Sequence, residues 1–348
     1  MKKRLTLEEI GKLAGVSRAT VSRVINNHPN IRQEVRERVE HIIAETGYQP
    51  NAAARSLASN RSDIIGLFIP FVVDALFNSP YFALLIQGIA QACNSYNLTL
   101  SLFLLENDHD ERALQRLAGN TLIDAMIVYT DSTQPDNVSY RLIESLKRRH
   151  VPFVQVCTPL TDMTGIPYVD IDHEAGAYQA TRHLIQEGYQ RIGQIRTSGN
   201  ITSALRDVGY RRAMKEAGLS IDESLTVYGN YSEKSGYLAM QQFIAMNGSM
   251  PDAVFSHADT MAFGALRALR ERSLSVPQDL AMVGFDDLPG SAASDPPLST
   301  VRQPIKQLGQ AAVDLLQEVI AAEDLVVRKT VVPVELVVRA SSKGLPTA

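Results

Sequence analysis

A tight turn between two short helices is predicted within residues 6–26, and this feature constrains the fold more than any other in the sequence. Thr6 and Glu9 have the spacing of a capping box, in which each side chain bonds the backbone N–H of the other and starts a helix. Gly15 permits the left-handed backbone of a turn, and Ser17 is a good N-cap for the second helix. The chain therefore begins with a helix, a turn and a helix.

Apolar residues recur at helical spacing on one side of each helix, which predicts a small core. They are Ile10, Leu13 and Ala14 in the first helix and Val21, Val24 and Ile25 in the second. A third amphipathic helix from about Arg32 to Thr46, with Gly47 as its C-cap, closes this core. The outer side of the second helix carries Arg18, Ala19, Ser22, Arg23 and Asn26. The pattern is typical of a helix-turn-helix, whose second helix lies in the major groove of DNA.

Charge is divided unevenly along the chain. Residues 1–62 hold eleven Lys and Arg against six Asp and Glu, whereas residues 63–348 hold 23 against 32. A basic head on an acidic body is typical of a nucleic-acid-binding protein. The alternative, a small helical hairpin without a function of its own, does not account for this excess of positive charge.

Strands and helices alternate from Asp63 onward. A chain of 348 residues with 45% hydrophobic content can fill a small head and two further cores. The predicted strands include I-I-G-L-F-I-P, L-T-L-S-L-F-L-L, A-M-I-V-Y-T and F-V-Q-V-C, and then, in a second set that begins near Pro167, I-G-Q-I, L-T-V-Y, A-V-F-S and A-M-V-G-F. Repeated βαβ units with right-handed crossovers give doubly wound parallel sheets. The sequence thus predicts two similar α/β lobes.

Cysteine use and hydropathy exclude several classes of protein. Cys93 and Cys157 are too few for a disulfide framework and lack metal-ligating neighbours, so we expect buried thiols and neither a metal nor a cofactor. The N-terminal M-K-K-R leads into a charged helix, where a signal peptide would have an apolar run. No stretch reaches the roughly 18 apolar residues that a membrane-spanning helix needs. We expect a cytoplasmic protein that makes no membrane contact.

Several blocks of the sequence resemble the lactose/galactose repressor (LacI/GalR) family of bacterial transcription regulators. V-S-R-A-T-V-S-R-V-I-N-N and G-Y-Q-P-N-A-A-A-R-S-L-A are similar to its headpiece and hinge, and R-D-V-G-Y, A-D-T-M-A-F-G-A-L and V-G-F-D-D extend the resemblance along the chain. The resemblance implies an α/β fold with a helix-turn-helix headpiece (1–49), a hinge helix and linker (50–62) and a two-lobed core like that of periplasmic binding proteins (63–348). It also implies crossings between the lobes near residues 160, 290 and 325, which assign 63–160 and 291–324 to the first lobe and 161–290 and 325–342 to the second.

The resemblance assigns DNA contacts to the headpiece. Arg23 matches a position that contacts bases, and a guanidinium can donate to both O6 and N7 of guanine. Arg18 and Ala19 match the variable positions that set operator choice. The remaining polar residues are expected to contact DNA mostly at phosphates: Thr6, Ser17, Thr20, Ser22 and Asn26.

The hinge at residues 51–58 is expected to form a helix only conditionally. Asn51 is a good N-cap, but the segment is far shorter than the roughly 12–15 residues that an isolated helix needs in water. In the family, the paired hinge helices of a dimer enter the minor groove, and the residue that matches Leu57 wedges between base pairs. The resemblance therefore adds Asn51, Ala54 and Leu57 to the DNA contacts. It also implies a homodimer on a pseudo-palindromic operator.

The resemblance places a small-molecule effector between the lobes, at the carboxyl ends of the strands. Arg206 matches a ligand-contacting arginine, and Asp286 matches an acceptor of ligand hydroxyls. Phe82 and Tyr231 are candidates for apolar faces against a sugar or base ring, with ordinary core packing as the alternative.

Two positions depart from the family pattern. Cys157 stands where many sugar-responsive relatives carry aspartate, and Ala258 stands where many carry asparagine before the aspartate that is Asp259 here. By their positions, Cys157 and Asp259 are counted among the expected effector contacts. His257 is a candidate for a replacement contact, with a structural role as its alternative. The departures leave open a larger effector, such as an oligosaccharide or glycoside, or an effector outside the sugars.

These features together predict a repressor whose operator affinity is controlled by a small molecule, most simply a sugar or sugar derivative. An activator and a purine-type co-repressed regulator of the same architecture stay open. A sugar-binding transport receptor would leave the basic residues 1–62 without a use. No nucleophile elbow, phosphate-binding glycine loop or H-E-x-x-H motif occurs, so we do not expect an enzyme.

Overall fold

The computed structural model describes most of the chain, in two compact units that comprise residues 1–62 and 63–348. The described residues are 5–25, 28–48, 62–70, 76, 79–104, 114, 115, 117, 119, 122–160, 163, 165–246, 250–322 and 328–343.

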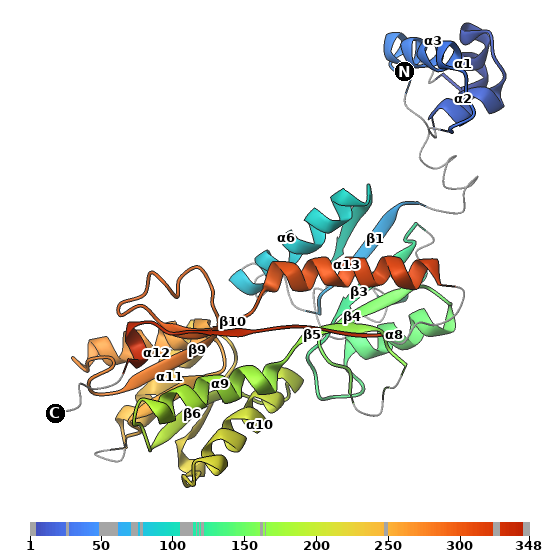
Figure 1. The fold of residues 1–348 in the computed structure, drawn as a ribbon. Coiled ribbons are helices and arrows are strands. Elements are labelled where there is room, and N and C mark those ends of the chain that lie inside the picture. The colour runs from blue at the N-terminus through green and yellow to red at the C-terminus, as the bar shows by residue number, and fades with distance from the viewer. Residues whose placement is uncertain are drawn as a thin grey trace. The chain divides into compact units, whose positions relative to one another are not determined.

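The described residues of the first unit form three helices, α1 (Leu7–Ala14), α2 (Arg18–Ile25) and α3 (Gln33–Thr46) (Figure 1). The helix starts and turns follow the sequence closely: Thr6 and Glu9 form the predicted capping box, and Gly15 adopts a φ of 64°. Ile10, Val21, Val24 and Val39 form the centre of the small core. One expectation was wrong, since Leu13, assigned to the core side of α1, is 58% exposed.

The second unit contains two six-stranded sheets, and the first sheet is entirely parallel. Its strands, in spatial order, are β11 (Lys329–Val332), β5 (Tyr168–Ile171), β4 (Phe153–Val156), β3 (Ala125–Tyr129), β1 (Ile64–Phe68) and β2 (Thr99–Phe103). All residues of β3 and β4 are buried, as expected for the centre of a parallel sheet. The bounded helices among the described residues of this lobe are α6 (Pro80–Ser95), α8 (Val138–Arg148) and α13 (Ile305–Ala321). Helices α6 and α13 pack side by side (Figure 1).

The second sheet is parallel except at one edge. Its spatial order is β12 (Glu335–Val337), β10 (Ser299–Arg302), β9 (Ala281–Asp286), β8 (Ala253–Ser256), β6 (Ile192–Thr197) and β7 (Thr226–Gly229). Strand β12 runs antiparallel to β10, a departure from the purely parallel sheet that was predicted. The helices of this lobe are α9 (His173–Gln186), α10 (Ile201–Glu216), α11 (Glu233–Ile244) and α12 (Asp259–Glu271), with short 3₁₀ turns at Glu223–Leu225 and Ala340–Ser342. Buried apolar side chains of both lobes join in one continuous cluster.

The chain passes between the sheets later than the expected positions near residues 160, 290 and 325. Strand β5 pairs with β4 in the first sheet, so the first crossing follows Ile171. Strand β10 still belongs to the second sheet, so the next crossing follows Arg302. Near the C-terminus the extended segment 329–337 divides around Pro333, which lacks a backbone N–H: β11 joins the first sheet and β12 the second. Within the described residues, no helix is long and apolar enough to cross a bilayer.

Candidate functional site

The exposed side of α2 presents the residues that were predicted to contact bases. Arg18, Ala19 and Arg23 are exposed, whereas Ser22 is half-buried. Val24, on the opposite side, is buried in the small core. The helix therefore offers a guanidinium and a methyl group to a major groove, as direct readout of base edges requires.

The predicted phosphate-contacting hydroxyls lie at the starts of α1 and α2. The Thr6 hydroxyl accepts from the Glu9 backbone N–H at 3.2 Å, and the Ser17 hydroxyl accepts from the Thr20 backbone N–H at the same distance. The side-chain oxygens of Ser17 and Thr20 lie 2.9 Å apart. These positions place hydroxyls at helix N-termini, a combination that suits phosphate. Four further predicted contacts fall outside the described residues: Asn26, Asn51, Ala54 and Leu57.

The predicted effector residues lie at or near the carboxyl ends of strands from both sheets. Cys157 follows β4, His257 follows β8 and Asp286 ends β9. The structure brings three of them together with partners that sequence reasoning missed, in a group that we call the interlobe cluster: Asp131, Asp170, His173, Arg206, His257 and Asp286, all buried.

Arg206, on α10, is held from several directions. Its guanidinium donates to the backbone oxygen of His257 and to Nδ1 of His173, the latter at 3.3 Å. It lies 3.7 Å from the centroid of the Phe285 ring, and its Nη2 is 3.9 Å from Oδ1 of Asp286. A planar cation fixed in this way is preorganised to donate to a ligand without losing side-chain entropy on binding.

Asp286 ends β9 in a constrained backbone conformation. Its φ is 127°, and the next residue, Asp287, has a φ of 55°, so the two carboxylates diverge. Asp287 pairs with Arg302 and Arg339, both at 2.6 Å, whereas Asp286 accepts from the side-chain amide of Gln303. Burial raises the pKa of Asp286 to about 8, against the opposing charge of Arg206. Near neutral pH this carboxyl is therefore largely protonated and can donate as well as accept.

His173 and Asp170 are functional candidates that the sequence reasoning missed. Nε2 of His173 lies 3.1 Å from Oδ1 of Asp170, and its Nδ1 accepts from Arg206. Although burial opposes ionisation, the hydrogen bonds from His173 and Thr158 hold the pKa of Asp170 below its usual value. The assembly links β5 of the first sheet to α10 of the second lobe. The segment D-I-D-H, at a strand end followed by a helix start, was the available signal.

His257 and Asp259 are engaged by neighbours within the second lobe. Both ring nitrogens of His257 have partners, Ser203 at 3.1 Å and Gln194 at 3.0 Å, and burial holds the pKa of its ring well below the usual value. The Asp259 carboxylate accepts from three groups: the backbone N–H of Leu288 at 2.9 Å and the hydroxyls of Ser291 at 2.5 Å and Thr300 at 2.6 Å. In this structure, the side chains of both predicted effector residues hold the strand-end loops in place.

An aromatic wall from the first lobe borders the interlobe cluster. Phe82 packs edge-on against Tyr81 and Tyr129, with ring centroids 5.3 and 5.1 Å apart. Burial raises the pKa of Tyr81 well above its usual value, and the nearby Cys157, Asp170 and Asp286 add to the effect. Tyr81, which sequence reasoning missed, therefore faces the same groups as Arg206 does.

Asp131, immediately after β3, bonds across to the second lobe. Its two carboxylate oxygens accept from the backbone N–H of Thr202 at 2.8 Å and from the Thr202 hydroxyl at 2.7 Å. The same hydroxyl lies 3.1 Å from the hydroxyl of Tyr231, a half-buried residue with a φ of 64°. Asp131 is thereby linked to the predicted Tyr231 through Thr202. Sequence reasoning missed it, although it directly follows the strand A-M-I-V-Y-T.

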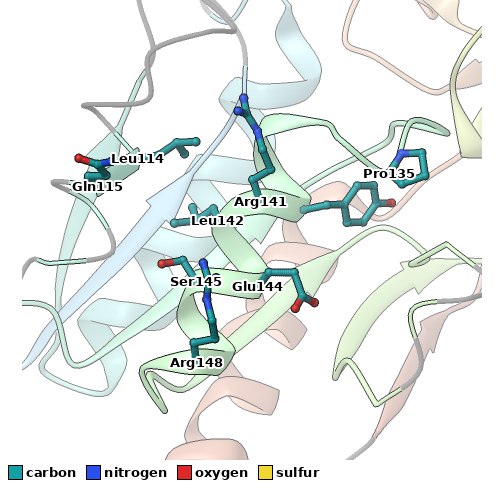
Figure 2. Close-up of a pocket in the computed structure, with 9 residues that line it drawn as sticks. Leu114, Gln115, Pro135, Arg141, Leu142, Glu144, Ser145 and Arg148 are labelled. Atoms are coloured by element: carbon teal, nitrogen blue, oxygen red, sulfur yellow. The ribbon is translucent and has the colours of Figure 1, made fainter.

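A separate cavity of about 340 Å³ lies in the first lobe beside α8 (Figure 2). It is lined by Leu114, Gln115, Pro135, Tyr140, Arg141, Leu142, Glu144, Ser145 and Arg148. None of the predicted effector residues belongs to this lining, so the cavity is distinct from the interlobe cluster. In the part of the chain that the structure describes, no group of three or more His, Cys, Asp or Glu side chains could hold a metal ion.

Both units match known protein families. Residues 6–51 match the family described as bacterial regulatory proteins, lacI family, and residues 181–342 match the periplasmic binding protein-like domain. The chain is 34% identical to the HTH-type transcriptional regulator CelR of Thermobifida fusca, over 98% of this chain and 99% of the relative. It is 33% identical to catabolite control protein A of Priestia megaterium, over 90% and 91% of the two chains.

Solved structures agree with these relatives. A lac repressor dimer bound to operator and the anti-inducer ONPF is similar with a TM-score of 0.84 and 27% identity, covering 98% of this chain and 99% of that chain. A complex of the transcriptional regulator CelR with cellobiose is similar with a TM-score of 0.72 and 32% identity, covering 97% and 100%. The predicted helix-turn-helix head and two-lobed α/β core are thus confirmed, and the chain belongs to the LacI family of bacterial regulatory proteins.

Proposed function

We propose that this protein is a transcription repressor whose affinity for operator DNA is controlled by a small molecule bound at the interlobe cluster. The observation that carries the proposal is the setting of Arg206, a buried guanidinium fixed by both His173 and the His257 carbonyl at the meeting point of the two lobes. A ligand that contacts Arg206 and the first lobe together changes the relative stability of the arrangements of the lobes. By linkage, effector and operator then change each other's affinity by the same factor.

The chemistry of the cluster favours a hydroxylated ring compound as the effector. Asp286, Gln303 and Arg206 supply acceptors and donors that suit sugar hydroxyls, and Tyr81 and Phe82 supply aromatic surface for a ring face. One relative, CelR, has been solved with cellobiose. We therefore propose a saccharide, and specifically one larger than a monosaccharide. Cys157 and Ala258 replace an aspartate and an asparagine of many relatives, so fewer polar side chains are available here to hold a single sugar ring.

The partner of the head is double-stranded operator DNA in the cytoplasm, read by a homodimer. The exposed Arg18, Ala19 and Arg23 of α2 form the base-reading side. A relative with 27% identity has been solved as a dimer on its operator. Two copies of α2 reading a pseudo-palindromic site follow from twofold symmetry. The role is regulatory rather than catalytic.

A ligand screen followed by operator binding tests this function. Monosaccharides, β- and α-linked disaccharides and nucleobases are first compared for their effect on the melting temperature of the full chain. Each ligand that raises it is then added to an operator titration, with the operator selected from a random DNA library. We expect a disaccharide to raise the melting temperature and to change operator affinity at least tenfold. Stabilisation without any change in operator affinity would contradict control by that ligand, and a nucleobase hit would replace the saccharide.

A further inference from the structure

The start of α10 is capped by a residue from the opposite lobe. The N-cap residue, Asn200, makes no side-chain capping bond of its own. Instead, the Asp131 carboxylate accepts from the backbone N–H and the hydroxyl of Thr202, and its backbone oxygen accepts from the N–H of Ile201 at 3.2 Å. Asp131 is only 8% exposed, so these bonds are shielded from water. The first turn of a 16-residue helix is thus occupied by an anionic group.

Buried hydroxyls flank this contact. The side chains of Thr130 and Thr197 are buried, and their hydroxyls interact with Tyr140 and Tyr231 respectively. Thr130 precedes Asp131, and Thr197 ends β6 directly before the loop that leads into α10. Because a hydroxyl has one donor and two acceptor sites, these groups can still bond to a ligand that enters here.

Two carboxylates carry the negative charge near this contact, Asp131 itself and Asp170, whose pKa stays below its usual value. Asp286, in the same cluster, is largely protonated near neutral pH, and Arg206 is the cation, bonded to His173. Burial raises the pKa of Asp131. The hydrogen bonds from Thr202 and the charge of Arg206 oppose this effect and favour the ionised form. A second anion brought to this place would meet like charges in a medium of low dielectric constant, where repulsion is strong.

We infer that Asp131 is a specificity-determining residue of the effector site: it occupies the place at the start of α10 that a ligand phosphate or carboxylate would take, and so restricts the site to neutral hydroxylated ligands. This inference rests on the proposed function and names the chemistry of the effector. A neutral hydroxyl can donate to the Asp131 carboxylate and share it with Thr202. An anionic group can only compete with it.

Inorganic phosphate tests the inference without any knowledge of the effector. The full chain is compared as wild type, Asp131→Ala, Asp131→Asn and the control Asp136→Asn, which removes an exposed carboxylate from the same loop. The melting temperature is followed against phosphate, with chloride at matched ionic strength as the reference. Phosphate bound by the basic head contributes equally to all four proteins.

Wild type and Asp136→Asn are expected to respond alike. Asp131→Ala is expected to gain additional phosphate-dependent stabilisation, with an apparent affinity at least tenfold tighter than that of the wild type. Asp131→Asn removes the charge but keeps a side chain in place, so its gain is expected to be smaller. For each variant, the melting temperature in chloride is subtracted from that in phosphate. This removes the change in melting temperature caused by losing the Asp131–Thr202 bonds and leaves the part caused by phosphate binding. Equal phosphate responses in wild type and both Asp131 variants would overturn the inference.

A pair of matched sugars separates this inference from the proposed function. Calorimetry compares cellobiose with its acid, cellobionate, on wild type and Asp131→Ala. We expect the preference for the neutral sugar to fall at least tenfold in the variant. An unchanged preference would overturn the role of Asp131 while leaving the saccharide effector in place. If neither sugar binds the wild type, this saccharide is excluded as the effector, and the phosphate experiment still decides the role of Asp131.

Discussion

The guanidinium of Arg206 and the carboxyl of Asp286 lie 3.9 Å apart, beyond direct hydrogen-bond distance, although both are buried. Each is held by another partner, Arg206 by His173 and Asp286 by Gln303. The pair is therefore positioned by its surroundings rather than by its own attraction. A ligand hydroxyl that bonds to both groups would complete a contact that the protein leaves open.

Replacing Arg206 by alanine is expected to remove the effector response while the protein stays folded. The His257 carbonyl and Nδ1 of His173 would lose a donor, at a cost in unfolding free energy of about 1–3 kcal/mol. Calorimetry with the saccharide found in the ligand screen measures the loss of binding. Arg212→Ala is the matched control, because Arg212 lies on the same helix but is exposed and pairs with the half-buried Glu174. An unchanged response in Arg206→Ala would contradict the assignment.

His173 is expected to act through Arg206 as a positioning residue. His173→Ala should weaken effector binding about tenfold, and His173→Gln, whose side-chain oxygen can accept from Arg206, should recover part of the loss. A double-mutant cycle with Arg206→Ala is the decisive measurement, since residues that act as one unit give non-additive losses. Additive losses in the cycle would show that His173 acts independently of Arg206.

The parts of the fold set by local chemistry were predictable from the sequence. The Thr6–Glu9 capping box and the positive φ of Gly15 and Gly47 depend only on neighbouring residues, and all three appear as expected. The lobe crossings depend instead on pairing between distant strands. The short strand Tyr168–Ile171 gives no local sign that its partners lie in the first sheet.

The same distinction applies to the site. Arg206 and Asp286 belong to sequence blocks that carry a family resemblance, so they were identified in advance. Asp131 and His173 acquire their significance only through contacts with residues that are 71 and 33 positions away, Thr202 and Arg206 respectively. No helical or strand periodicity reports such contacts. Side-chain geometry was needed to find them.

Asp259 is expected to support the loop after β9 rather than bind the effector. Asp259→Ala would leave the Leu288 N–H and the Ser291 and Thr300 hydroxyls without their acceptor, and we expect a loss of at least about 2 kcal/mol in unfolding free energy. Chemical denaturation of the core measures this loss. Effector affinity measured on the folded fraction should change by less than about threefold, which corresponds to about 0.6 kcal/mol of binding free energy. A large loss of affinity in a stable variant would make Asp259 a ligand contact.

Arg23 is expected to discriminate bases rather than merely attract DNA. Arg23→Ala should remove the preference at one guanine in each half-site, a discrimination worth roughly 1–3 kcal/mol, while other positions of the operator keep their preferences. Competition titrations with operators mutated at single positions provide the measurement. Lys12→Ala, an exposed basic residue of α1, is the control and should weaken all operators to the same extent or not at all. Uniform losses for Arg23→Ala would indicate a phosphate contact.

The protonation of Asp286 predicts how stability depends on pH. Its pKa is raised to about 8 in the folded protein, against roughly 3.9 in an unfolded chain. Between these values the folded state binds more protons, so the contribution of Asp286 to stability is fully present below the lower value and is lost as the pH rises toward the higher one. The asparagine in Asp286→Asn does not titrate, so this variant does not lose the contribution. The difference in unfolding free energy, variant minus wild type, should therefore increase by at least about 1 kcal/mol between pH 5 and pH 8. Chemical denaturation of the core at several pH values measures the difference, with Asp136→Asn as the exposed control. Parallel pH profiles for wild type and Asp286→Asn would show that Asp286 is ionised in the folded protein throughout this range.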